Sequence, residues 1–132
     1  MKTRCGFVSN SSSSSFLIVS RKDLSKEFLL HSFGISETSP FAHFASSMAQ
    51  TIMRLARKYD LIEELAEDDF CGNVAYIPEA FKPLIEKWKK EDLKLYYGVF
   101  YNGEDETTEF LNQWDLNFET DQMEMAHLRN GF

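Results

Sequence analysis

Five consecutive serines, Ser11 to Ser15, are the first residues in this sequence that could take part in chemistry. A serine acts as a nucleophile only when a base lies beside it and a site for the oxyanion is present. The histidines His31, His43 and His127 are scattered along the chain, and no Gly-x-Ser-x-Gly motif occurs. The sequence therefore predicts no catalytic residue.

The candidate metal ligands are the same three histidines and two cysteines, Cys5 and Cys71. None of these residues are paired at the spacing of two to four positions that zinc sites usually show. We therefore predict neither a metal site nor a cofactor. Two cysteines form no disulfide framework, and in a reducing compartment we expect both to be free thiols.

The serine-rich segment could instead bind an anion, because it offers many backbone N–H groups and hydroxyls between basic residues. It does not match a P-loop, in which a strand precedes the glycine-rich loop and a Lys-Ser/Thr pair follows. The alternative is a loop that satisfies its own backbone through serine hydroxyls. The residues that an anionic small ligand could use are Arg4, Ser11, Ser12, Ser13 and Arg21.

Carboxylates gather in two runs, at 60–69 and 104–109. A general acid needs a carboxyl group in an apolar site, whereas runs of carboxylates usually form a solvated surface. Such a surface steers a partner of opposite charge. We predict that the second run contacts a protein partner with a basic surface, through Glu104, Asp105, Glu106 and Glu109.

Charge is distributed unevenly along this chain, whose net charge is −7. Residues 1–59 carry eight basic and three acidic side chains, whereas residues 60–132 carry six and eighteen. The acidic half would repel phosphate backbones, which disfavours nucleic acid as a partner. No apolar run approaches the roughly 18 residues that span a bilayer, so no membrane contact and a cytoplasmic location are predicted.

Hydrophobic residues make up 43% of the 132 residues, which predicts one folded domain over 1–132. The twelve phenylalanines indicate either an aromatic-rich core or an aromatic patch that is kept for a partner. Helical spacing changes to strand spacing near residue 93, which predicts an α+β fold. Helices are expected at about 21–33, 40–59 and 79–90, with a short acidic helix at 60–69.

The strongest predicted helix is 40–59, where apolar residues recur every three or four positions. Its stripe should face the core. The stripe consists of Phe41, Phe44, Met48, Ile52, Leu55 and Tyr59. The preceding helix is expected to begin after Ser20 as its cap and to end at Gly34.

The predicted strands form a mainly antiparallel sheet. Residues 93–101 are apolar on both faces, as in a central strand. Asn102-Gly103 is a strong hairpin signal, so a returning strand is expected at 105–111 and a third at 114–120. Residues from Met123 onward could form either a fourth strand or a short helix.

The first strand is predicted at about 15–19, behind an ordered serine loop. Phe16 to Val19 are four consecutive apolar residues, and such a run hides both faces only inside a sheet. The nearest strand with two apolar faces is 93–101. We therefore predict that these two segments pair.

Residues 6–16 resemble the opening GFVSNSSSSSF of small uncharacterised proteins of bacteriophages and bacteria. The resemblance covers about the first 19 residues. It implies a phage or prophage origin and a product that is not secreted, but no activity. Those proteins commonly carry Arg-Asn before the glycine, where this chain has Arg4-Cys5.

Three functions remain open from the sequence. The first is a small, acidic, non-enzymatic interaction factor, encoded by a phage, that modulates or inhibits a host protein. Charge asymmetry, surplus aromatic residues and the missing catalytic motifs favour it. The second is a structural or assembly component that uses the serine-rich arm. The third is a binder of small anionic ligands at the serine-rich loop, and the sequence indicates no oligomeric state.

Overall fold

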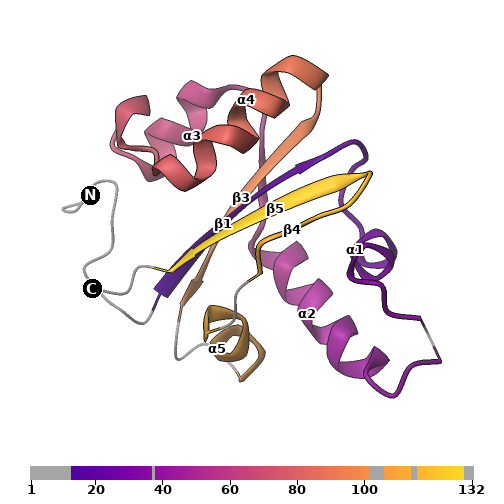
Figure 1. The fold of residues 1–132 in the computed structure, drawn as a ribbon. Coiled ribbons are helices and arrows are strands. Elements are labelled where there is room, and N and C mark those ends of the chain that lie inside the picture. Colours follow the sequence, from indigo (N-terminus) through magenta and orange to yellow (C-terminus); the bar gives the residue numbers. More distant parts are fainter. Residues whose placement is uncertain (1–12, 37, 102–105, 114–115, 130–132) are drawn as a thin grey trace.

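The computed structural model describes residues 13–36, 38–101, 106–113 and 116–129. Figure 1 shows one sheet with helices on both sides. In chain order the elements are β1 (Ser13–Ser20), α1 (Lys26–Phe33), α2 (Ala42–Leu55), β2 (Arg57–Tyr59), α3 (Ile62–Asp69), η1 (Val74–Tyr76), η2 (Glu79–Phe81), α4 (Lys82–Glu91), β3 (Lys94–Tyr101), α5 (Glu106–Gln113), β4 (Phe118–Glu119) and β5 (Met123–Arg129). The predicted α+β fold is confirmed.

The sheet has the strand order β2-β3-β1-β5-β4, and every pairing in this part of the chain is antiparallel. β1 is the central strand and pairs with β3 in the register Phe16 to Gly98. Its other edge pairs with β5 in the register Phe16 to His127. The predicted pairing of Phe16–Val19 with residues 93–101 is confirmed. The segment from Met123 onward, for which the sequence allowed either a strand or a short helix, forms the strand β5.

The two faces of the sheet support separate cores, because side chains alternate along each strand. On one face, Leu17 and Val19 of β1 pack beneath α3, α4 and the 3-10 turns. On the other face, Phe16 and Ile18 pack against α1, α2 and α5. We call the first group of helices the α3–α4 layer and the second the α1–α2 layer.

β1 begins earlier than predicted, at Ser13, and all eight of its residues are buried. Ser13 to Ser15 are therefore part of the strand and do not form a loop, whereas Ser9 to Ser12 lie outside the described residues. The ring of Phe16 stacks on Phe100 at 4.7 Å. Gly98 makes room for Phe16, since a β-carbon at Gly98 would overlap the Phe16 ring.

Two helix boundaries differ from the prediction. α1 begins at Lys26 with Ser25 as its cap, because Ser20 is the buried last residue of β1. α2 ends at Leu55, and the backbone turns extended at Ala56, so residues 57–59 form the edge strand β2. Gly34 ends α1 in the left-handed conformation with φ of 77°, as predicted.

The predicted strand at 105–111 is wrong, because residues 106–113 form helix α5. The Asn102-Gly103 signal behind that prediction lies outside the described residues. Thr108 and Leu111 are buried three positions apart, which is the spacing of one helix face. The predicted strand at 114–120 shrinks to Phe118–Glu119. Helix 79–90 is confirmed as η2 followed by α4, and helix 60–69 as α3.

The cysteine prediction is also wrong. Cys71 is disulfide-bonded, so it is not a free thiol. Cys5, the other cysteine of the chain, lies outside the described residues.

Candidate functional site

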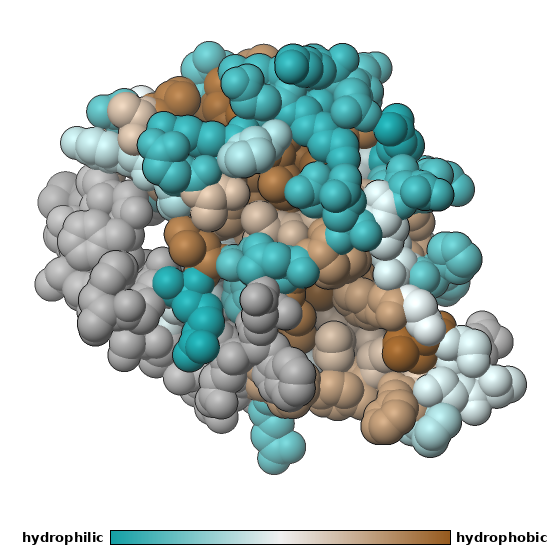
Figure 2. Space-filling model, viewed as in Figure 1, coloured by the Kyte–Doolittle hydropathy of each residue, from teal (hydrophilic) through white to brown (hydrophobic). Residues whose placement is uncertain are grey.

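An apolar groove lies between the α1–α2 layer and the strand β4, with a volume of about 570 Å³. We call it the apolar groove throughout. In Figure 2 a tan and brown area extends over the α1–α2 side of the molecule, whereas teal predominates over the α3–α4 side at the top. Its lining comes from α1, the start of α2 and the chain around β4. These residues are Ser32, Phe33, Ile35, Phe41, Phe44, Ala45, Met48, Leu116, Asn117, Phe118, Glu119 and Thr120.

Local sequence signals place the helical wall of the groove. The Ser25 hydroxyl accepts a hydrogen bond from the backbone N–H of Phe28 at 3.1 Å, which fixes the start of α1. Gly34 ends α1 and lets the chain turn back toward α2. Phe33 at the end of α1 then packs edge-on against Phe118 of β4, with ring centroids 5.8 Å apart.

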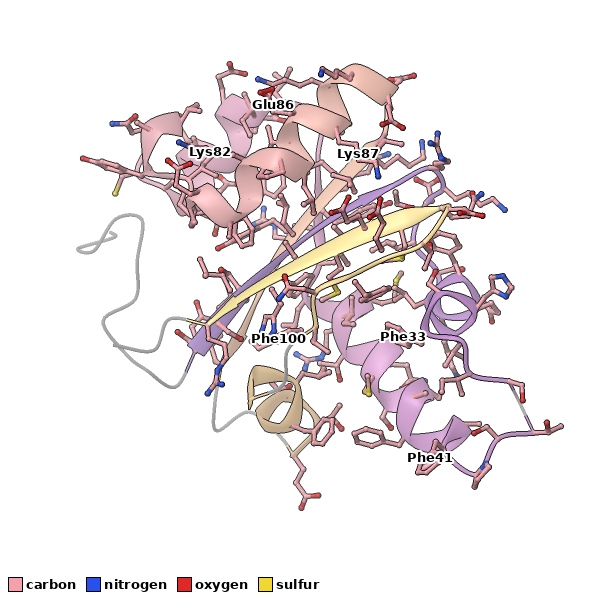
Figure 3. The ribbon with its side chains drawn as sticks, in the orientation of Figure 1. Phe33, Phe41, Lys82, Glu86, Lys87 and Phe100 are labelled. Atoms are coloured by element: carbon pink, nitrogen blue, oxygen red, sulfur yellow. The ribbon has the colours of Figure 1, made fainter. Side chains whose placement is uncertain are left out.

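Two phenylalanines at the start of α2 are exposed above the groove. Phe41 is 68% exposed and Phe44 is 39% exposed. Both were predicted as core residues, and for them that prediction is wrong. Figure 3 shows Phe41 and Phe33 on the same side of the molecule, far from the charged side chains of α4. Phe44 also contacts Phe110 of α5 edge-on at 4.7 Å.

The opposite wall of the groove is an edge of the sheet. β4 pairs with β5 on one side and is the last strand in the sheet order, so its other side has no strand neighbour in the described sheet. The side-chain amide of Asn117 holds this segment in place by bonding both backbone groups of His127, at 2.9 and 3.3 Å. An edge strand presents backbone N–H and C=O groups that can pair with another chain.

Among the described residues that line the groove, Glu119 is the one that can ionise, and it is paired with a lysine. Lys87 Nζ of α4 lies 3.2 Å from Glu119 and 3.3 Å from Glu124. Burial lowers the pKa of Lys87, but these two carboxylates outweigh it and raise the pKa above its ordinary value. The groove is therefore lined mainly by apolar side chains, and its Glu119 carboxylate shares the Lys87 ammonium with Glu124.

Of the predicted anion-binding residues, the structure describes only Ser13 and Arg21, and these two lie at opposite ends of β1. Ser13 is buried at the start of β1, and Arg21 follows the other end of the same strand. Arg21 forms an ion pair with Glu91 at 2.9 Å and donates a hydrogen bond to the backbone of Asp121. Arg4, Ser11 and Ser12 lie outside the described residues.

The predicted acidic contact surface is described only in part. Glu106 is exposed as the first residue of α5. The backbone of Glu109 belongs to the same helix, whereas its side chain lies outside the described residues, as do Glu104 and Asp105.

Sequence reasoning missed a serine–histidine contact. Ser14 Oγ lies 2.7 Å from Nε2 of His127, and both residues are buried. Ser14 is wholly enclosed in the central strand, paired on both sides, so a substrate cannot reach its hydroxyl. The contact is a polar link between β1 and β5. No spacing rule could find it, because 112 residues separate the two partners.

Comparison with known proteins adds no assignment, since the chain matches no protein-family model, no curated protein and no solved structure. Within the described ranges, no three histidine, cysteine or acidic side chains group where they could hold a metal ion. None of the helices in these ranges is long and apolar enough to cross a membrane.

Proposed function

We propose that this chain is a small non-enzymatic interaction protein that binds an apolar segment of another protein in the apolar groove. The observation that carries the proposal is the exposure of Phe41 and Phe44 above a groove of about 570 Å³. Soluble proteins seldom leave neighbouring aromatic side chains in water unless they serve binding. Aromatic residues, phenylalanine included, are also enriched at the cores of protein–protein interfaces.

The groove favours an extended segment as the occupant. One wall is the β4 edge, whose backbone can pair with an added strand, and the other wall is aromatic. Added strands place alternate side chains on one face, so two or three apolar side chains would contact Phe33, Phe41 and Phe44. A mainly apolar lining favours uncharged side chains at those positions, because burying a charge there would be costly.

Selection of binders from a random peptide library, displayed on phage, tests this proposal. We expect the intact chain to enrich peptides with apolar residues at alternate positions. Phe41→Ser and Phe44→Ser should each weaken binding of an enriched peptide at least tenfold. Met53→Ser is the matched control, because Met53 lies on the same helix, outside the groove, and is 36% exposed. An affinity that is unchanged in the Phe41→Ser and Phe44→Ser variants, or the absence of enriched peptides, would overturn the proposal.

A second copy of this chain is the competing occupant, and it corresponds to an assembly role. Light scattering across a concentration series distinguishes the two. Under our proposal the chain stays monomeric at the concentrations used for peptide binding. A dimer that Phe41→Ser converts to monomer would assign the groove to self-association instead.

The acidic half of the chain supports a further part of the proposal, in which a basic surface on the partner is steered toward Glu106 and its neighbours. Glu106→Lys should slow association and reduce its dependence on salt. The resemblance of residues 6–16 to phage proteins supports a host protein as the partner and the host cytoplasm as the location. The disulfide at Cys71 counts against that compartment, because disulfides persist mainly in oxidising environments.

A further inference from the structure

Hydrogen bonds between β5 and the chain around β4 show which backbone groups face the open edge beside the apolar groove. The backbone N–H and C=O of His127 both bond to the Asn117 side chain. The C=O of Met123 accepts a hydrogen bond from the Thr120 N–H at 2.7 Å. Alternate residues of an antiparallel strand direct their backbone groups to the same neighbour, so Met125, which lies between these two, also bonds toward β4.

Glu119 is the residue of β4 that an added strand would bond. Phe118 pairs with Met125, so the backbone N–H and C=O of Phe118 point inward to β5. Glu119 is the next residue along β4, and its backbone N–H and C=O therefore point away from the sheet. Within the described ranges, no hydrogen bond engages these two outward groups. They are available to a strand that lies in the groove.

The side chains of β4 point to opposite faces of the sheet. Phe118 faces the apolar groove, where its ring contacts Phe33. The Glu119 carboxylate faces α4, where it lies 3.2 Å from Lys87 Nζ. Cross-strand neighbours share a face, so a residue opposite Glu119 would point to the α4 side. The residues before and after it would point into the groove.

The face of the sheet that carries Glu119 has more carboxylates than cations. Glu119 lies opposite Glu124 in the β4–β5 pair, and like charges in that arrangement repel each other. Lys87 Nζ is 3.2 Å from one and 3.3 Å from the other, so a single ammonium serves two carboxylates. Arg21, a cation on the same surface, is held by Glu91 at 2.9 Å. The Glu119 side chain is 63% exposed, so a second cation can reach it.

We infer that the segment bound in the apolar groove is an added strand with a lysine or arginine between two apolar residues, and that this basic side chain pairs with Glu119. The inference rests on the proposed function and names the chemistry of its partner. The two apolar side chains enter the groove, while the backbone between them bonds to the outward groups of Glu119. An acidic residue at the middle position would instead meet two carboxylates that already share one lysine.

Selections from the same random peptide library on three proteins test the inference. The intact chain and Glu64→Lys should enrich Lys or Arg between two apolar residues, whereas Glu119→Lys should lose this preference. Glu64→Lys is the matched control, because it makes the same change of charge at an exposed residue of α3, which follows the opposite edge strand β2. Circular dichroism first checks that each variant is folded.

The selections separate the inference from the proposed function. Apolar peptides without a basic residue at the middle position, or the same basic preference on all three proteins, would overturn the inference and leave the groove as proposed. Loss of apolar enrichment on the intact chain would instead overturn the proposed function.

The affinity of a selected peptide gives a quantitative test. Replacing its basic residue by glutamine should weaken binding to the intact chain about two- to fivefold, the usual effect of losing a cross-strand ion pair. Glu119→Gln should bind both peptides equally. Lys87→Gln should bind the basic peptide more tightly than the intact chain does, because the two carboxylates then lack their lysine. A preference for the basic peptide that persists in Glu119→Gln would contradict the assigned contact.

Methylation of the peptide backbone tests the strand pairing itself. Only alternate amides of an added strand point toward β4. N-methylation at every second residue should therefore weaken binding at least tenfold in one alternation and much less in the other. Equal losses in the two alternations would show that the segment does not bind as a strand.

Discussion

The two helical layers cover opposite faces of the same sheet, yet they expose different kinds of side chain to solvent. The α3–α4 layer buries Leu65 and Phe81 completely and presents charged side chains outward, including Lys82 and Glu86 (Figure 3). The α1–α2 layer also has a buried core around Leu29 and Ile52, but it leaves aromatic rings in water at the start of α2.

Each layer meets a different edge of the sheet. α3 follows directly on β2 at one edge, and the Tyr59 hydroxyl bonds to both Asp68 at 3.0 Å and Asp69 at 3.1 Å. At the opposite edge, β4 is only two residues long and leaves the start of α2 uncovered. The aromatic residues at the start of α2 are therefore exposed because the edge strand is short, and not because the core is poorly packed.

Truncation in the closed α3–α4 layer should give the largest loss of stability. Phe81→Ala removes a fully buried ring from that core and should lower the free energy of unfolding by about 3–5 kcal/mol. Phe41→Ala should change it by less than about 0.5 kcal/mol, because the ring is already in water. Urea denaturation of both variants checks the contrast. Similar losses from the two would mean that the layers do not differ as described.

A second pair of variants tests the boundary between core and surface within α2 itself. Ile52→Ala should cost about 2–5 kcal/mol, because Ile52 is buried against the sheet. Met53→Ala, one position on and partly exposed, should cost far less. Denaturant midpoints measured side by side decide the matter, and equal costs would contradict the assigned face of α2.

Gly98→Ala should cost about 1–3 kcal/mol through overpacking. The added β-carbon would lie 2.8 Å from the backbone oxygen of Leu55 and would overlap the Phe16 ring. The strain therefore falls on the α1–α2 side of the sheet. Thermal unfolding should show a lower midpoint, and the companion change Phe16→Leu should restore part of it by freeing space. An unchanged midpoint would show that the sheet centre is loosely packed there.

The smallest effect is confined to alkaline solution and belongs to the α3–α4 side. Burial, then the Asp69 carboxylate, raises the pKa of Tyr59 and of Tyr97 above the ordinary tyrosine value of about 10. The folded state therefore keeps these protons when the unfolded chain loses them. Their contribution to stability is complete below pH 10 and falls as the pH rises beyond it.

Tyr97→Phe should flatten this alkaline decline in the free energy of unfolding measured between pH 8 and 11. Tyr101→Phe is the control, since Tyr101 ends the same strand and is exposed. A decline of the same slope in both variants would remove the buried tyrosine as its cause.

The parts of the fold that follow from burial were predictable from sequence. Phe16–Val19 pairs with β3 because a run that is apolar on both faces has few other places to go. Prediction failed at α5, where it relied on a two-residue turn signal. The preference of Asn102-Gly103 for a hairpin did not decide the structure of the residues that follow. Tertiary contacts did, because a helix buries Thr108 and Leu111 on one face within the α1–α2 layer.

The candidate site was less predictable than the fold. A helical stripe shows that Phe41 and Phe44 share a side with Ile52, but not whether the sheet is long enough to cover them. The two walls of the apolar groove come from residues near 41–48 and 116–120, and only the strand order brings them together. The surplus of phenylalanine was the one available signal, and it left core and patch as equal alternatives.

The central position of β1 has a consequence for how the chain is made. Its neighbours β3 and β5 are synthesised long after it. Phe16 pairs with Gly98 on one edge and with His127 on the other, and both residues leave the ribosome much later than Phe16 does. At ribosomal rates that interval is on the order of ten seconds. Throughout it the nascent chain carries an apolar strand with both edges open, the kind of segment that chaperones shield and that aggregates when they do not.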